Sequence, residues 1–178
     1  MKKVLAIASV LVLMSCKKEE PSLQEYFVES GEKKEFMAMD ISSSILNVNE
    51  NKLTAAEKQA LASFDKVNVL AFKKDDKNNA QYSKEIKEVK EILKDTSYQP
   101  LIRLNGVGHN ASIMLVGDNK EIDELILFGN QKELGFTVIR VLGNDMKPEN
   151  AMQFFSILQK SNIDMEQLKP ILNFVNKK

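Results

Sequence analysis

The sequence predicts an α+β protein of one domain, in which a largely antiparallel sheet is covered by amphipathic helices. Four apolar segments follow one another after residue 100, separated by the stretches GHN, GDNK and GNQK. Glycine, asparagine and aspartate supply the backbone torsions of tight turns, so these segments indicate an antiparallel meander in the C-terminal half. The sequence on either side carries apolar residues at helical spacing, which predicts the covering helices.

The N-terminal half predicts alternating helices and strands. Thr54 and Glu57 have the spacing of a capping box, in which each residue binds the backbone of the other, so a helix is expected to begin there. The three serines at 42–44 are expected to form a turn or the start of a helix. The expected elements are helices at 23–28 and 54–63 and strands at 36–41 and 67–72.

Three further helices are indicated by apolar residues that recur every three or four positions. We expect the first two to pack against the meander, and the charged face of the first to be a solvated surface. Pro170 is expected to interrupt or restart the third. The apolar faces are Tyr82, Ile86, Val89 and Leu93; Ala151, Phe154, Phe155 and Leu158; and Met165, Leu168, Leu172 and Val175.

The meander strands are expected at residues 101–107, 112–116, 124–128 and 136–142. Successive side chains of a strand point to opposite faces, yet every residue in 113–116 and 125–128 is apolar. Both faces of the sheet are therefore expected to be covered by helices, or the sheet curls around its own interior. The alternative is an apolar groove that receives a lipid or a partner protein.

The N-terminus has the features of a targeting segment. Lys2 and Lys3 precede an apolar stretch at 4–14, which is shorter than the roughly twenty residues of a membrane-spanning helix. Residues 13–16, Leu-Met-Ser-Cys, resemble the lipobox of bacterial lipoproteins. That resemblance implies that Cys16 is lipidated, that the chain is cut before it, and that Cys16 anchors the protein to a membrane.

The expected organisation is thus a signal peptide at 1–15, a lipidated cysteine with a charged tether at 16–21, and one domain at 22–178. The usual route of such lipoproteins leads to the outer membrane. The stretch KKEE at 17–20 resembles the signal that exports some lipoproteins of the Bacteroidota to the cell surface. Read as a plain charged spacer, it leaves the domain facing the periplasm.

Charge and composition argue against nucleic-acid binding. The chain has 25 basic and 25 acidic residues, and removal of Lys2 and Lys3 leaves 23 against 25. Arginine occurs only at positions 103 and 140, so bidentate phosphate contacts are scarce. We expect no nucleic-acid partner.

No residue pattern predicts catalysis, a cofactor or a metal. His109 is the sole histidine, and Asp118 and Asp123 are the carboxylates that could join it. Gly106 and Gly108 lack the third glycine of a dinucleotide loop and are expected to be hairpin glycines. With Cys16 lipidated, no thiol remains for chemistry, so we expect a protein that is not an enzyme.

Between residues 23 and 175 the chain resembles the domain-of-unknown-function family 4252. The resemblance rests on "EFMAMDISSSIL" near the start, "IDELILF" in the meander and "TVIRVLGNDMKPENAMQFF" at its end. The resemblance implies a small, often lipidated envelope protein of the Bacteroidota without established catalytic residues. The function expected from these features is a non-catalytic, membrane-anchored module for protein interaction or envelope maintenance. The alternative is a lipid or small-molecule binder that uses an apolar sheet face.

Overall fold

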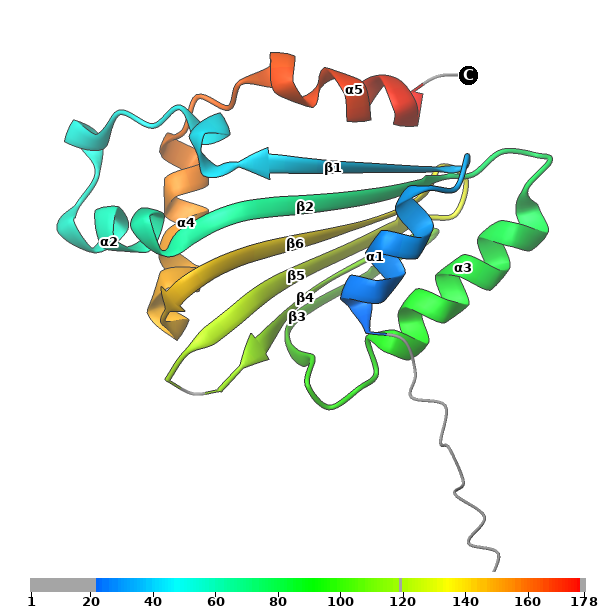
Figure 1. The fold of residues 1–178 in the computed structure, drawn as a ribbon, viewed down its shortest axis with the longest axis horizontal. Helices are drawn as coiled ribbons and strands as arrows, with labels where there is room; N and C mark the ends of the chain where they lie inside the picture. Colours follow the sequence, from blue (N-terminus) through cyan, green and yellow to red (C-terminus); the bar gives the residue numbers. More distant parts are fainter. Residues whose placement is uncertain (1–21, 119, 177–178) are drawn as a thin grey trace, which may run out of the picture.

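The structure is a computed structural model, and it describes residues 22–118 and 120–176 (Figure 1). Its centre is a six-stranded, fully antiparallel sheet in the order β1-β2-β6-β5-β4-β3. The α+β class, the antiparallel sheet and its meander are confirmed. The strands are β1 (Phe36–Ser42), β2 (Phe64–Lys73), β3 (Gln99–Gly106), β4 (His109–Gly117), β5 (Ile122–Gln131) and β6 (Gly135–Met146).

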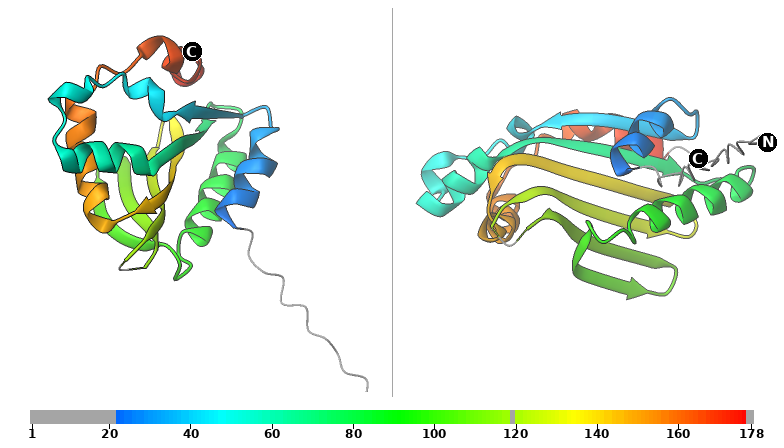
Figure 2. Two further views of the ribbon diagram at one scale, coloured as in Figure 1. Left: turned by 60° about the vertical axis from the view of Figure 1, so that its left-hand side comes forward. Right: turned by 60° about the horizontal axis from the view of Figure 1, so that its bottom comes forward.

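The helices lie on both sides of this sheet (Figures 1 and 2). The meander β3 to β6 folds back on itself, so that β6 pairs with β2 and the edges of the sheet are β1 and β3. The predicted lipidation site Cys16 and the tether lie outside the described residues. The helices are α1 (Leu23–Gly31), the short η1 (Ser43–Leu46) and η2 (Glu50–Lys52), α2 (Ala55–Ser63), α3 (Asn79–Ile92), α4 (Pro148–Lys160) and α5 (Met165–Asn176).

The helix starts follow from local side-chain chemistry. The capping box predicted for α2 is present: Glu57 N donates to Thr54 Oγ1 at 3.2 Å, and Thr54 N donates to a Glu57 carboxylate oxygen at 2.8 Å. Ser22 and Glu25 form the same motif at the start of α1. Ser42 caps η1 by accepting a hydrogen bond from Ser44 N, which confirms the role predicted for the serines.

Helices α1 and α3 cover what we call the first face of the sheet. Val89 of α3 and Tyr26 of α1 are almost wholly buried against it, and Phe72 and Phe136 stack with their ring centroids 5.4 Å apart. The predicted apolar face of α3 is confirmed, because Ile86 and Leu93 also pack on this cluster. The buried face also carries one acidic residue, Glu85, at 2% exposure. The prediction that the charged residues of this helix form a solvated surface therefore does not hold for Glu85.

Helices α2, α4 and α5 lie on the opposite side, the second face. Ala60 of α2 and Ile157 of α4 are fully buried, and the rings of Phe64 and Phe154 are 4.6 Å apart. The helices on the two faces of the sheet therefore enclose two separate cores, one on each face. The side chains of Phe155 and Leu158 lie outside the described set.

Several strand boundaries differ from the sequence prediction, among them the end of β5. Strand β5 continues to Gln131, so the GNQK stretch is mostly strand and the turn falls at residues 132–134. Gly135, which follows, has φ +124°, and a Cβ there would lie 2.0 Å from the carbonyl oxygen of Phe72. A glycine is required by this close approach of two backbones. The turn is therefore fixed by Gly135 and not by Gly129.

Helix α5 also differs from the prediction. It continues through Pro170 without interruption, and its packed side chains are Leu168 and Ile171. Met165 and Leu172, which we expected on the apolar face, are 53% and 39% exposed. Among residues 22–118 and 120–176, no helix is long and apolar enough to cross a membrane.

Candidate functional site

The second face carries a continuous row of apolar side chains that runs across the meander. In the strand register Ile102 of β3 lies opposite Ile113 of β4, Ile113 opposite Leu127 of β5, and Leu127 opposite Ile139 of β6. Such cross-strand neighbours lie within contact distance on one face of a sheet. The row therefore forms one uninterrupted apolar surface.

The next row on the same face is built from small residues. Ala111 lies opposite Leu104 on one side and Gly129 on the other, and Gly129 lies opposite Thr137. A Cβ placed on Gly129 would meet no heavy atom within 4 Å. The two rows enclose a hollow of about 270 Å³. We call it the apolar trough, lined by Ile102, Leu104, Ala111, Ser112, Ile113, Leu127, Phe128, Gly129, Thr137 and Ile139.

The trough is open because the helices on the second face cover only part of that face. In Figures 1 and 2, α2 and α4 lie at one end of the sheet, and α5 lies against β1 and β2. Ile102 and Leu104 are consequently 43% and 64% exposed. Helices therefore do not cover this part of the second face, contrary to the first expectation for the sheet, and an apolar hollow lies there. That the hollow receives a lipid or a partner protein stays a prediction.

The edge strand β3 borders the trough and is exposed along its whole length. Its inner side pairs with β4, and its outer side pairs with no strand among residues 22–118 and 120–176. Val107, in the turn that follows, is fully exposed. Pro100 lacks an N–H, and the pairing shifts register between Pro100 and Ile102, so the regular free edge extends from Ile102 to Gly106.

The residues singled out for chemistry do not converge. His109 is the exposed first residue of β4, and its Nδ1 lies 3.1 Å from the carbonyl oxygen of Val107. Asp118 accepts hydrogen bonds from the backbone N–H groups of Lys120 and Glu121, which lower its pKa. Within the described part of the chain, no three histidine, cysteine or acidic side chains are grouped as metal ligands.

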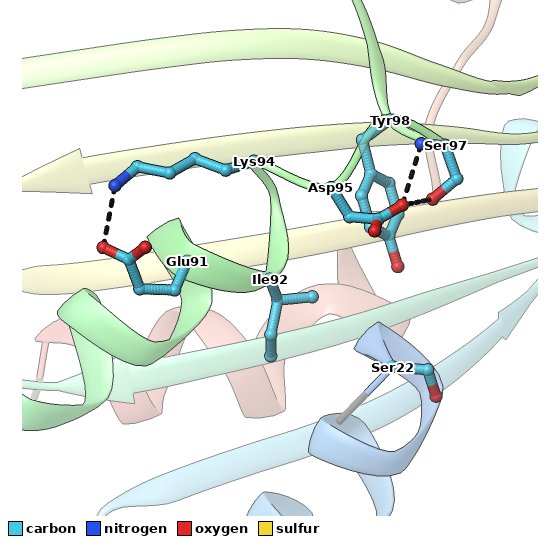
Figure 3. A pocket seen from close by; sticks show the side chains of 7 residues that line it. All are labelled: Ser22, Glu91, Ile92, Lys94, Asp95, Ser97 and Tyr98. Carbon is cyan, nitrogen blue, oxygen red and sulfur yellow. Dashed lines mark hydrogen bonds and ion pairs between the residues drawn. The ribbon is translucent and has the colours of Figure 1, made fainter. Parts of the chain in front are cut away.

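A second pocket, of about 340 Å³, lies where the domain begins (Figure 3). Its polar groups are already paired. Lys94 Nζ lies 2.8 Å from Glu91, and Asp95 accepts hydrogen bonds from the N–H and hydroxyl of Ser97 at 2.9 and 2.6 Å. Ser22 also lines this pocket. These contacts stabilise the loop between α3 and β3.

Glu57 has a role that the capping box did not reveal. Besides capping α2, it accepts hydrogen bonds from Lys160 Nζ at 2.6 and 2.8 Å and from the hydroxyl of Ser156 at 2.6 Å. These partners lower the pKa of Glu57 to about 2, the Lys160 contact contributing most. The carboxylate, 2% exposed, thereby ties α2 to α4.

A comparable cluster joins α1 to α3. Glu85 accepts a hydrogen bond from the Tyr26 hydroxyl at 2.9 Å and pairs with Lys33 Nζ at 3.1 Å. Burial and then the Glu85 charge raise the pKa of the Tyr26 hydroxyl. Each group has its partners inside the fold, so the cluster is structural.

The fold and the trough define a small α+β domain with an open apolar surface. The chain belongs to the family described as domain of unknown function (DUF4252), whose profile matches residues 26–154. The match extends from α1 into α4 and includes every strand. No curated protein and no solved structure matches the chain.

Proposed function

We propose that this protein is a non-catalytic module of the bacterial cell envelope, anchored to the outer membrane by lipidated Cys16, which binds another envelope protein through the apolar trough and the β3 edge. The observation that carries the proposal is an exposed apolar face of the sheet that continues to a free strand edge. Leu104, at 64% exposure, stands where the two meet. An apolar surface of this kind on a small domain favours a partner over solvent.

The partner that fits is an extended segment with apolar side chains at alternate positions. Such a segment can add to β3 by backbone hydrogen bonds, while every second side chain enters the trough. The stretch Ile102–Gly106 offers the regular edge for this pairing, and Pro100 limits it at the other end. The trough is lined by no charged side chain, so the partner's inserted residues are uncharged.

The anchor would hold this surface close to the membrane. Six residue steps separate Cys16 from Ser22, and a fully extended chain of this length spans about 20 Å. The trough would therefore stay within reach of other membrane-attached proteins. KKEE at 17–20 would decide whether the domain faces the cell surface or the periplasm.

A lipid or another small apolar molecule in the same trough is the second candidate. It is favoured by the hollow of about 270 Å³ that Ala111 and Gly129 leave between larger neighbours. Clefts that bind small molecules begin near 300 Å³, so the hollow suits a single short chain.

The test is photo-crosslinking in intact cells, with benzoylphenylalanine in place of Leu104. The same probe in place of Val28 is a matched control, because Val28 is 66% exposed on α1, away from the trough. We expect the Leu104 probe to give one discrete protein adduct, and peptide mapping to place the link in an extended apolar segment. The Val28 probe should not give this adduct.

Equal adducts from both positions, or none from Leu104, would overturn the proposal. An adduct with lipid alone would reject a protein partner and establish the second candidate.

A further inference from the structure

A third pocket lies on the first face, on the other side of the sheet from the trough. It occupies about 320 Å³ between the C-terminal end of α3 and strands β3 and β4. Part of its floor is apolar: Met114 and Phe128 are 4% and 6% exposed, and Leu93 is half-buried beside them. Its uncharged lining is completed by Asn105, Asn110, Ala111 and Ser112. We call it the cationic pocket because of the residues at its rim.

Every ionisable side chain that lines the cationic pocket, among the described residues, is basic. These are Lys90, Lys94 and Arg103. Lys94 is partly neutralised by Glu91, at 2.8 Å, whereas Lys90 and Arg103 form no ion pair within the described part of the chain. In a chain with equal numbers of acidic and basic residues, this rim is a local excess of positive charge.

We propose that the cationic pocket binds a single-chain anionic amphiphile of the fatty-acid class. The carboxylate would lie at Arg103 and Lys90, which can give charge-assisted hydrogen bonds. The first part of the hydrocarbon chain would lie on Met114, Phe128 and Leu93. A free inorganic anion would make no contact with this apolar floor, and a neutral amphiphile would leave the two cations without a partner.

The pocket also lies close to the membrane-proximal end of the domain. Lys94 lines both this pocket and the one that contains Ser22. This proximity to the bilayer rests on the proposed anchor at Cys16, but the chemistry of the pocket does not.

The test is isothermal titration calorimetry on the mature chain, residues 16–178, in which Cys16→Ser prevents lipidation. The ligands are decanoate below its critical micelle concentration, decanol below its solubility limit, acetate and inorganic phosphate. We expect decanoate to bind and the other three to bind at least about tenfold more weakly. Removing one charge-assisted hydrogen bond by Arg103→Gln should weaken decanoate about tenfold. Lys84→Gln, on α3 like Lys90 but outside the pocket, should leave the affinity for decanoate unchanged.

Several results would overturn the proposal: equal binding of decanoate and decanol, phosphate binding as tight as decanoate, no effect of Arg103→Gln, or no binding of decanoate. Gly129 lines the trough and not the cationic pocket, so Gly129→Val distinguishes a failure of this proposal from a failure of the proposed function. Decanoate binding that Gly129→Val abolishes and Arg103→Gln spares would place the amphiphile in the trough. Because Arg103 is exposed, its variant should unfold at the wild-type temperature.

Discussion

Replacing Gly129 by valine should abolish partner binding while leaving the fold intact or slightly more stable. Gly129 lies inside β5, two residues before its end, has no left-handed backbone torsion, and has open space where a Cβ would be. Glycine inside a strand costs about 0.5–1 kcal/mol relative to alanine, and a β-branched residue suits a strand. The free energy of unfolding should therefore rise by about 0.5–1 kcal/mol, which for this chain length raises the Tm by about 1–4 °C.

The matched control is Gly135→Val, which makes the same chemical change six residues further along. Gly135 has φ +124° and no room, since its Cβ would clash with the carbonyl oxygen of Phe72 at 2.0 Å. A strained backbone of this kind costs about 1–3 kcal/mol before the clash is counted, so the Tm should fall by at least about 2 °C. The two glycines thus separate an open surface position from a packed one.

The assay combines thermal unfolding of the mature Cys16→Ser chain, followed by circular dichroism, with photo-crosslinking from position 104 in cells. Gly129→Val should keep the wild-type Tm or exceed it and lose the protein adduct. If Gly129→Val lowers the Tm as far as Gly135→Val does, the trough is a packed site and the reasoning fails. If the adduct persists at wild-type yield, the partner does not enter the trough.

Further predictions concern the anchor, acid stability and the core. An alkyne fatty acid should label the wild type and not Cys16→Ala, and equal labelling of the two would contradict lipidation at Cys16. Protease added to intact cells should digest the domain unless residues 17–20 are replaced by alanine. Protection of the wild type would contradict export to the cell surface. The pKa of Glu57 is lowered to about 2 from an ordinary value near 4.5, so its stabilising effect is complete above about pH 4.5 and is lost as the pH falls toward 2. The Tm difference between wild type and Glu57→Gln should shrink over that interval, and a constant difference would show that the carboxylate is not held ionised. Leu70→Ala, at a fully buried position, should lower the free energy of unfolding by about 2–5 kcal/mol and the Tm by about 4–20 °C. His109→Ala and EDTA should each leave the Tm unchanged. A drop in Tm with either one would indicate a metal site at the turn beside His109.

The sequence was sufficient for the fold class because its signals are local. The turn stretches of the meander, the helical spacing of α3 and the Thr54–Glu57 capping box each involve residues a few positions apart. The meander, the apolar face of α3 and the capping box are confirmed. The other partners of Glu57 are 99 and 103 residues away, so no local pattern could reveal them. Glu85 did leave a signal. It lies three residues after Tyr82 and four before Val89, on the apolar face of α3, which should have indicated burial with a partner.

The sequence predicted the apolar side chains of the trough but not whether a helix covers them. Apolar residues at every position of 113–116 and 125–128 predicted two apolar faces, which the sheet has. Whether a helix covers a face depends on where α4 and α5 pack, and that is set by contacts such as Phe64 with Phe154, far apart in the chain. The small residues Ala111 and Gly129 are the clue that remained. Covered sheet faces are filled by large side chains to native density, so small residues beside an apolar row leave space for an atom that belongs to another molecule.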